Sequence, residues 1–365
     1  MFLEAENSFG LNLLSTLPAN QSIVFSPLSI ALALSLVHSG AKGRSKDQIG
    51  DVLLKGASDD QFVSHFQFIS TSFEESLNGV KVSVANRVFL SKDFTPEPSY
   101  LTTVQKNYNA SAESLDFTTP TAAQKINNFV KTSTEGKIDK LVTPESIEDA
   151  VAILVNAIYF KGDWADNFAA SDTSNRDFHQ VSGKILKIPF MGENGYHRLY
   201  AEDDLFQVLV LKYQDPKFQF AIFLPKVKEN GLEGAVGKLN ACRFQKLINA
   251  AENTYLNTLI PKFTVEKEFT LKSSLTKLGI TEIFSDQADL SGLTGLPKNL
   301  KISDGAHKAI IEVNEDGTTA AASTMVKAVP MSFPINPPTD FKADHPFLFA
   351  LVRESHPLFL GVFHG

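Results

Sequence analysis

The sequence has very little cysteine and no excess of positive charge. Cys242 is the only cysteine among 365 residues, so this chain cannot form an internal disulfide. We interpret Cys242 as an ordinary core or surface side chain. Acidic residues outnumber Lys and Arg by 41 to 34, which gives a formal net charge of -7 at pH 7. This balance argues against nucleic acid or an anionic membrane as the main partner.

Membrane-spanning, targeting and linker segments are missing as well. No apolar run approaches the length that crosses a bilayer. The stretch from Met1 to Glu6 lacks the pattern of a secretory signal, which favours a cytoplasmic, intracellular location. Two glycosylation sequons, at Asn20 and Asn109, favour secretion instead, and that alternative stays open. No linker rich in Gly, Ser or Pro and no internal repeat divides the chain, so we expect one domain over residues 1–365.

The local motifs of common enzyme classes are also absent. The chain contains no G-x-S-x-G, H-E-x-x-H, C-x-x-C, G-x-G-x-x-G or G-x-x-x-x-G-K sequence, and its eight histidines are scattered. A hydrolytic triad assembled from distant residues would leave no such motif. The sequence therefore favours a protein that is not an enzyme, and it predicts no metal site and no cofactor.

Hydrophobic periodicity predicts helices first and strands later. Apolar residues at helical spacing, with Ser26-Pro27 as a cap and first turn, predict helices around residues 9–17, 28–37, 62–73 and 122–132. Apolar runs and turn residues predict strands over residues 80–84, 151–160, 206–211, 218–224, 347–352 and 358–363. Because helices and strands do not alternate regularly, we expect an α+β fold.

One segment near the C-terminal end consists almost entirely of small residues. It runs from Glu315 through Gly317 to Thr324. Gly317 can adopt backbone angles that other residues resist, which suits a hinge. In an extended strand, side chains alternate between two faces. One face would carry Thr318, Ala320, Ala322 and Thr324, and the other Thr319, Ala321 and Ser323. We infer an exposed loop that can swing and insert into a sheet as a strand.

This segment resembles the reactive-centre loop hinge of the serpins, a family of serine protease inhibitors. Four further stretches resemble serpin motifs and occur in the family order: Phe25–Ala31, Asn156–Trp164, Leu278–Gly292 and Phe341–Phe349. Together they extend over nearly the whole chain. The resemblance implies the serpin fold, with three β-sheets, eight or nine helices and an exposed reactive-centre loop over about residues 315–340.

The resemblance also implies a mechanism. Serpins are suicide substrates, and the family spacing from Glu315 places the cleaved bond between Met331 and Ser332. The bait Ala328-Val329-Pro330 before Met331 is small and apolar, which suits serine proteases of the chymotrypsin, elastase or cathepsin G type. We expect a monomer that forms a covalent complex with its target. Inhibition of papain-like cysteine proteases, such as cysteine cathepsins, and a non-inhibitory serpin are the alternatives.

Other residues resemble the family's control elements. Ser26, Ser29, Asn156 and His307 match the shutter, a buried polar cluster through which the main sheet opens. Trp164 and Lys262, the latter paired with Glu315, match the breach at the top of that sheet. Without the resemblance, these are ordinary buried polar groups, a core aromatic and a surface ion pair.

Overall fold

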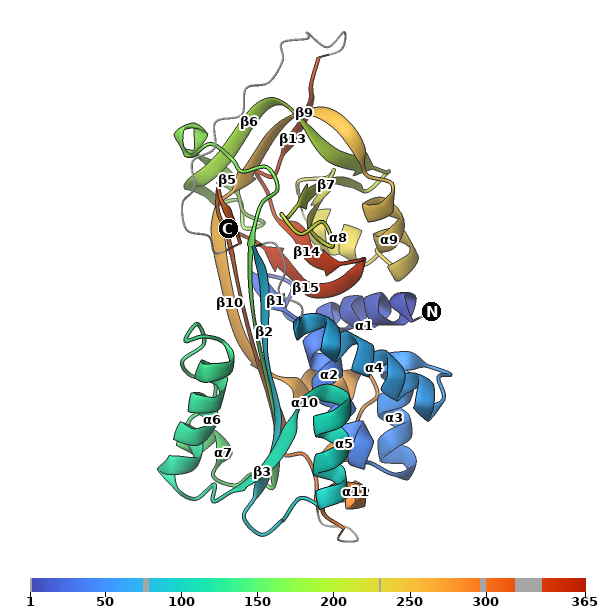
Figure 1. Cartoon of the computed structure of the whole chain (residues 1–365). Helices are drawn as coiled ribbons and strands as arrows, with labels where there is room; N and C mark the ends of the chain where they lie inside the picture. Colours follow the sequence, from blue (N-terminus) through green and yellow to red (C-terminus); the bar gives the residue numbers. More distant parts are fainter. Residues whose placement is uncertain (1, 75–78, 230, 296–299, 319–336) are drawn as a thin grey trace.

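The computed structural model describes residues 2–74, 79–229, 231–295, 300–318 and 337–365. Helices fill the first part of the chain, as predicted, and five of them pack together on one side of the molecule (Figure 1). These are α1 (Leu3–Ser15), α2 (Pro27–Gly40), α3 (Gly43–Leu54), α4 (Asp59–Glu74) and α5 (Pro98–Tyr108).

Helix α2 follows directly from its sequence. The Oγ atom of Ser26 accepts a hydrogen bond from the backbone N–H of Ser29 at 3.1 Å, and Pro27 occupies the first turn. Nearly every residue of α2 is buried, which explains why the helix is apolar on all sides. It ends at Gly40, where a Cβ atom would lie only 1.9 Å from the Leu293 side chain. The helix predicted around residues 28–37 is confirmed.

A six-stranded sheet forms the centre of the molecule, in the order β10-β11-β12-β4-β2-β3. Its strands are β2 (Val80–Ser91), β3 (Ser111–Leu115), β4 (Ala152–Asp163), β10 (Phe263–Thr270), β11 (Asp304–Val313) and β12 (Gly317–Thr318). Figure 1 shows the long strands between two helical layers. Helix α2 and its neighbours cover one face, and α6 (Pro120–Ser133) with α7 (Pro144–Ile147) covers the other.

Strand β4 is buried on both faces of this sheet, as its apolar run predicts. Leu154, Ile158 and Phe160 belong to the main core, which the helix α2 side chains share. Val155 and Ala157 belong to a second cluster that includes side chains of α6. Because side chains along a strand point alternately to opposite faces of the sheet, consecutive residues of β4 pack into different hydrophobic clusters.

A nine-stranded sheet packs above and beside the first (Figure 1). Eight strands follow the order β1-β15-β14-β8-β7-β6-β9-β13, and β5 pairs with β6. The strands are β1 (Ile23–Phe25), β5 (Ser174–His179), β6 (Ile185–Glu202), β7 (Phe206–Lys212), β8 (Phe218–Pro225), β9 (Glu252–Pro261), β13 (Thr339–Lys342), β14 (Phe347–Arg353) and β15 (His356–Phe363). Antiparallel pairing of β7 with β8 confirms the predicted hairpin.

Short helices connect the remaining strands. They are α8 (Gly231–Val236), α9 (Ala241–Asn249), α10 (Leu271–Lys277) and α11 (Ser291–Thr294), with 3-10 turns η1 (Ala170–Asp172) and η2 (Glu282–Phe284). Cys242 is exposed on α9. Among the described residues, no helix has both the length and the apolar character needed to cross a membrane.

The α+β class is confirmed, and the numbers of elements differ from those expected. The described residues contain eleven α-helices rather than eight or nine, because single turns such as α7 and α11 count as helices. They form two hydrogen-bonded sheets rather than three. The reason is β6, which pairs in turn with β5, β9 and β7 and so joins all of these strands into one sheet.

Candidate functional site

The described end of the predicted hinge, Gly317 and Thr318, lies inside the six-stranded sheet, between two long strands. Gly317 pairs with Asp163 of β4, and Thr318 pairs both with Gly162 of β4 and with Val313 of β11. We call this region the upper seam. Further down, β4 and β11 pair directly and in parallel, from Ile153–Tyr159 to Asp304–Ile310. We call that region the lower seam. The sheet is therefore split at one end of the seam and closed along the rest.

Gly317 is required by the close approach of two backbones. Its φ angle is +155°, and a Cβ atom would lie 2.1 Å from the carbonyl oxygen of Gly162. Gly162 is crowded as well, because a Cβ atom there would lie 2.8 Å from both Phe160 and Tyr213. Two glycines thus let the hinge pack directly against β4.

The side chain of Thr318 is fully buried and bonded to a tyrosine. Its Oγ1 atom lies 2.6 Å from the hydroxyl of Tyr213. Burial raises the pKa of Tyr213 well above its ordinary value, so the hydroxyl stays neutral. Position 318 therefore receives a small polar side chain, and its hydrogen-bond partner in the described part of the chain is a neutral hydroxyl. Tyr213 was not predicted from the sequence.

A tight turn precedes the hinge, formed by residues 314–317. The backbone N–H of Asn314 donates to the carbonyl of Gly317 at 2.9 Å. The Oδ1 atom of Asn314 accepts hydrogen bonds from the N–H groups of Asp316 and Gly317, both at 3.1 Å. This hinge turn, as we call it, reverses the chain so that β12 runs antiparallel to β11.

Trp164, predicted at the top of the sheet, holds the hinge turn from one side. Its indole Nε1–H donates to the carbonyl of Asn314, and its backbone N–H donates to that of Asp316, both at 2.9 Å. The buried indole stacks on Tyr213 with ring centroids 4.5 Å apart. Two predicted elements, the tryptophan and the hinge, are thus in direct contact.

Glu315 and Lys262 form the predicted ion pair, with Nζ and Oε2 atoms 2.9 Å apart. The Oγ1 atom of Thr173 donates to the other carboxylate oxygen at 2.8 Å. Partial burial by itself raises the pKa of Glu315, but hydrogen bonds from Lys262 and Thr173 outweigh it and leave the pKa below its ordinary value. The Lys262 side chain is 43% exposed, so we expect the ion pair to add little stability.

The lower seam contains a second, fully buried cluster. Ser26, Ser29, Asn156 and His307, predicted to act together, are all in contact there through hydrogen bonds. The Nδ2 atom of Asn156 donates to the carbonyl and the hydroxyl of Ser29, at 3.0 and 2.6 Å. It also contacts Asn86 of β2, which was not predicted. Asn156 therefore ties β4 to α2 and to β2.

His307 connects this cluster across the seam. Its Nδ1 atom bonds to Oδ1 of Asn156 on β4, and its Nε2 atom accepts from the backbone N–H of Ser26 at 3.3 Å. These partners are consistent with a neutral ring that carries its proton on Nδ1. Complete burial lowers the pKa of His307 to about 3, so the ring is uncharged at neutral pH.

The rest of the predicted loop lies outside the described residues. This applies to the bond between Met331 and Ser332, to the bait residues, and to the remainder of the hinge: Ala328, Val329, Pro330, Thr319, Ala320, Ala321, Ala322, Ser323 and Thr324. The described chain ends at Thr318 inside the sheet and resumes at Pro337, just before β13.

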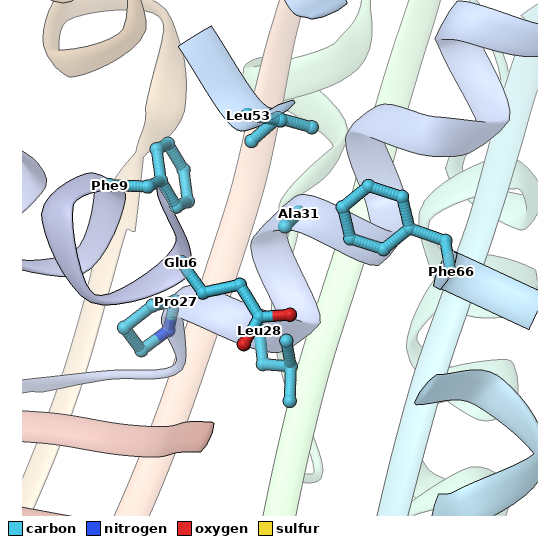
Figure 2. Close-up of a pocket in the computed structure, with 7 residues that line it drawn as sticks. All are labelled: Glu6, Phe9, Pro27, Leu28, Ala31, Leu53 and Phe66. Atoms are coloured by element: carbon cyan, nitrogen blue, oxygen red, sulfur yellow. The ribbon is translucent and has the colours of Figure 1, made fainter. Parts of the chain in front are cut away.

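A small cavity lies among the helices, away from the seam. Figure 2 shows it between α1, α2, α3 and α4, lined by Glu6, Phe9, Pro27, Leu28, Ala31, Leu53 and Phe66. Its volume is about 10 Å³, which is room for roughly one water molecule. The buried carboxylate of Glu6 is already occupied by His65 and by Nδ1 of His356, the latter at 2.5 Å. This cavity therefore does not extend the candidate site.

Comparisons with known proteins find one family along nearly the whole chain. Residues 4–364 match the family model described as serpin (serine protease inhibitor). Iripin-2 of Ixodes ricinus is 34% identical over 361 residues, which cover 95% of this chain and 88% of Iripin-2. Leukocyte elastase inhibitor A of Mus musculus is 34% identical over 375 residues, which cover 98% and 97% of the two chains.

Solved structures show the same fold. Serpin48 of the insect Tenebrio molitor, described as a highly specific serpin, superposes with a TM-score of 0.89 at 28% identity. The superposition covers 100% of this chain and 98% of Serpin48. A thyroxine-binding globulin in complex with thyroxine superposes with a TM-score of 0.86 at 26% identity, covering 100% and 98% of the two chains.

Proposed function

The chain belongs to the serpin family, and we propose that it is a suicide-substrate inhibitor of serine proteases that works by inserting its cleaved loop into the six-stranded sheet. The observation that carries this proposal is the position of Gly317 and Thr318, which already lie between β4 and β11. The small residues that follow Thr318 in the sequence would continue the same strand along the seam.

The register of β12 relates each later residue of the hinge to the positions on β4 and β11 that it would face after insertion. Thr318 lies opposite Gly162 of β4 and Val313 of β11, in antiparallel pairing. Six residues further along, Thr324 would lie level with Asn156 and His307, which now face each other across the seam. Insertion to this depth would separate the two strands at the buried cluster and break the contact between these two side chains.

The same register explains the residue types of the hinge. Residues directly opposite in a sheet project to the same face. Ala320, Ala322 and Thr324 would therefore share a face with Phe160, Ile158 and Asn156, whose side chains lie on the main-core side, as the buried Thr318 does. Thr319, Ala321 and Ser323 would project to the α6 side. A charged residue on the core face would have to be buried without a partner, which is costly.

The chemistry follows the general course of serine protease catalysis. The protease serine attacks the carbonyl carbon of Met331, an ester bond forms, and the Met331–Ser332 peptide bond breaks. The new amino group on Ser332 takes a proton and leaves with the C-terminal part of the inhibitor. The freed loop then inserts and carries the esterified protease with it, before water can hydrolyse the ester.

The bait favours proteases with an apolar primary pocket. Val329-Pro330-Met331 offers medium-sized apolar side chains, which suit chymotrypsin, elastase or cathepsin G rather than proteases that require a cation. Inhibition in this account needs one protease and one inhibitor molecule. The intracellular location and the monomeric state stay predictions from the sequence.

The test is to mix the protein at near-equimolar ratio with chymotrypsin, pancreatic elastase and cathepsin G and to run denaturing gels. We expect a complex that survives SDS, and a released peptide whose mass shows that it starts at Ser332. Cathepsin L serves as the cysteine-protease arm. Clean cleavage without a complex in every arm would show a substrate-like, non-inhibitory serpin and would refute the proposal.

A bait variant tests the position of the bond. Met331→Arg should form the complex with trypsin and lose it with chymotrypsin, because trypsin-like pockets bind a cation. Thr324→Val, at the far end of the hinge, is the matched control and should keep the original specificity. Unchanged specificity of Met331→Arg would place the bait elsewhere in the loop.

A further inference from the structure

The hinge turn is held by one particular stretch of chain, residues 164–173, which we call the support segment. Besides the two bonds from Trp164, the backbone N–H of Phe168 donates to the carbonyl of Glu315 at 2.9 Å. Thr173 donates to the Glu315 carboxylate at 2.8 Å. Much of the polar anchoring of the hinge turn thus comes from this segment, which has little regular structure of its own beyond the short η1 turn.

Arg198 of β6 fixes the middle of the support segment. Its Nη2 atom donates to the backbone carbonyl of Asp166 at 3.1 Å, and Nη1 lies 3.9 Å from the Asp166 carboxylate. Its guanidinium also lies over the ring of Phe168, 5.0 Å from the centroid. Arg198 therefore contacts both residues that flank Asn167, including the one whose N–H bonds to Glu315.

Arg198 is itself held rigidly by Glu193. The two side chains form a two-point contact, with Nε to Oε2 at 2.9 Å and Nη2 to Oε1 at 2.6 Å. Both are buried, with side-chain exposures of 7% and 5%. A fork-to-fork pair in this setting fixes the plane of the guanidinium, which leaves its remaining donors aimed at the support segment.

A β-bulge brings these two residues to the same side of the strand. Glu193 and Arg198 are five positions apart and would face opposite sides of a regular strand. The pairing of β6 with β9 skips Gly195, which is an extra residue between Asn194 and Tyr196. Gly195 has a φ angle of +70°, and a Cβ atom there would lie 2.5 Å from the Tyr255 hydroxyl. The bulge needs glycine, and it inverts the alternation.

We propose that Arg198, oriented by Glu193, is a positioning residue for loop insertion: it fixes the support segment, which holds the hinge turn in the shape from which β12 grows along the seam. This inference rests on the proposed function, because insertion is the step that it serves. After the protease is acylated, insertion competes with hydrolysis of the ester. A hinge turn that is less well held should insert more slowly and release more cleaved inhibitor.

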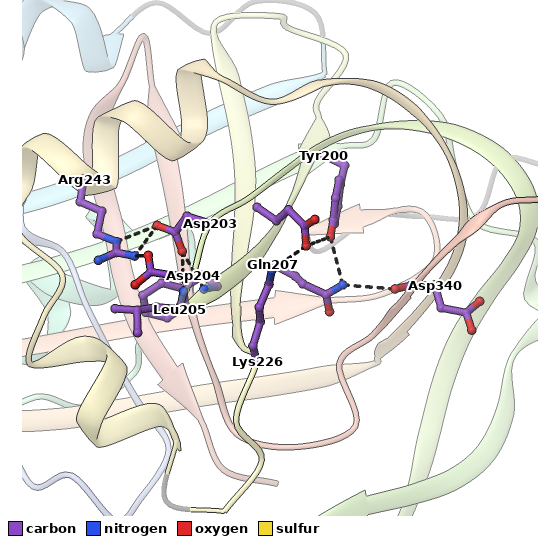
Figure 3. A network of polar contacts seen from close by, with 10 residues as sticks. Tyr200, Asp203, Asp204, Leu205, Gln207, Lys226, Arg243 and Asp340 are labelled. Carbon is purple, nitrogen blue, oxygen red and sulfur yellow. Dashed lines mark hydrogen bonds and ion pairs between the residues drawn. The ribbon is translucent and has the colours of Figure 1, made fainter. Parts of the chain in front are cut away.

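The chain offers a control ion pair at the end of the same strand, β6. Figure 3 shows Arg243 of α9 bonded to Asp203 and Asp204, with Nε to Oδ2 of Asp203 at 2.7 Å. Both carboxylates lie in the turn between β6 and β7, not in the support segment. Gln207, Tyr200 and Asp340 form a separate part of the network in that view.

The experiment compares Arg198→Met, Arg198→Lys and Arg243→Met with the wild type. The first readout is hydrogen exchange, measured by mass spectrometry on peptides that cover residues 164–173 and 313–318. This measurement does not depend on a target protease. The number of inhibitor molecules consumed per trapped protease reports the competition between insertion and hydrolysis. For Arg198→Met we expect faster exchange in both peptides and an insertion rate lower by about tenfold or more, as for the loss of one charged hydrogen bond.

Arg198→Lys should lie between Arg198→Met and the wild type, because an ammonium can pair with Glu193 but lacks the second arm toward Asp166. It also replaces Arg198→Met if that variant does not fold. Arg243→Met should match the wild type in both readouts. Wild-type exchange and an unchanged number of inhibitors per trapped protease in the Arg198 variants would overturn the inference. A wild type that traps no protease would instead refute the proposed function, and the exchange data would still show whether Arg198 holds the hinge turn.

Discussion

The upper and lower seams lie between the same two strands, β4 and β11, and are built in opposite ways. At the upper seam, Gly317 and Thr318 already separate the strands, and two glycines permit close backbone contact. At the lower seam the strands pair directly, and Asn156 and His307 bond across them. On the proposed mechanism, insertion would therefore start at the upper seam and be resisted at the lower seam.

This difference indicates how a closed sheet can stay closed until the loop is cut. The strand is already started at the upper seam, so an inserting loop need not create a new opening. Each further residue must part β4 from β11, and the buried cluster stands six residues away. Replacing backbone pairs between β4 and β11 by pairs with the inserted strand adds hydrogen bonds overall, since the new strand pairs on both sides. We expect the lower seam to set the barrier and the added strand to supply the driving force.

The largest effect is expected at the upper seam, from Thr318→Arg. The guanidinium would have to enter the buried space beside the neutral hydroxyl of Tyr213, the described hydrogen-bond partner of Thr318. Burying an unpaired charge costs several kcal/mol, so insertion should stop and the protein should become a substrate. Gel assays with a protease that the wild-type protein traps would show only cleaved inhibitor and no covalent complex.

Thr319→Arg is the matched control for this change. If β12 continued in the same register, position 319 would lie opposite the partly exposed Lys161 and its side chain would project away from Tyr213. The same side chain should therefore be tolerated one position later. Full inhibition by Thr318→Arg would contradict the strand register on which the account depends.

The lower seam is tested by Asn156→Leu. The variant keeps the size of the side chain but leaves His307 and Asn86 without their partner in a buried site. Loss of these bonds should lower the free energy of unfolding by about 3 kcal/mol or more. Denaturant unfolding would measure this, with Asn127→Leu as a comparison outside the seam. A stability equal to that of the wild type would show that the cluster does not hold the strands together.

A pH series sharpens the comparison of the two seams, because His307 of the lower seam is a buried histidine and the residues described at the upper seam include none. The pKa of His307 falls from an ordinary value near 6.5 to about 3 on folding. The unfolded chain therefore binds the extra proton first, and stability is lost as the pH falls below 6.5. The loss should reach about 2 kcal/mol between pH 6.5 and pH 5.

A second buried histidine must be separated in that experiment. Burial lowers the pKa of His38 to about 4, which gives a contribution of the same sign. The ring of His38 stacks on Phe62, so His38→Phe is the natural variant to remove it. If acid sensitivity between pH 6.5 and pH 5 vanished with His38→Phe alone, His307 would not be the responsible group.

The smallest effect is expected for Lys262→Met. The Lys262 side chain is 43% exposed, and Glu315 keeps its hydrogen bond from Thr173. Exposed ion pairs contribute less than about 1 kcal/mol, so thermal unfolding should shift only slightly. A large loss of stability would mean that this ion pair, rather than Trp164 and the support segment, holds the hinge turn.

The sequence predicted those parts of the site that depend on local patterns. The small residues after Gly317 indicated an insertable strand, and Ser26-Pro27 indicated the start of α2. The fold class and the family were also predicted from motifs and are confirmed. The functional roles of the hinge, shutter and breach residues stay proposals.

Other parts could not be predicted, because they depend on which strands pair and in what register. Asn86 joins the site only through the pairing of β2 with β4, and Tyr213, the residue after β7, joins it through its contact with Thr318. The Glu193–Arg198 pair depends on a bulge at Gly195 in β6, a strand that was not among those predicted from the sequence. Nothing in the linear sequence indicated that these residues face the same side.

The most direct test of loop insertion is the thermal stability of the cleaved protein. The cleaved protein would be prepared with a protease that cuts the loop without being trapped. The thermal unfolding temperatures of the cleaved and intact proteins would then be compared. If the freed loop inserts along the seam to Thr324, the cut protein should unfold at least about 10 °C higher, because both β4 and β11 gain a paired strand. An unchanged or lower unfolding temperature would contradict insertion and, with it, the proposed mechanism.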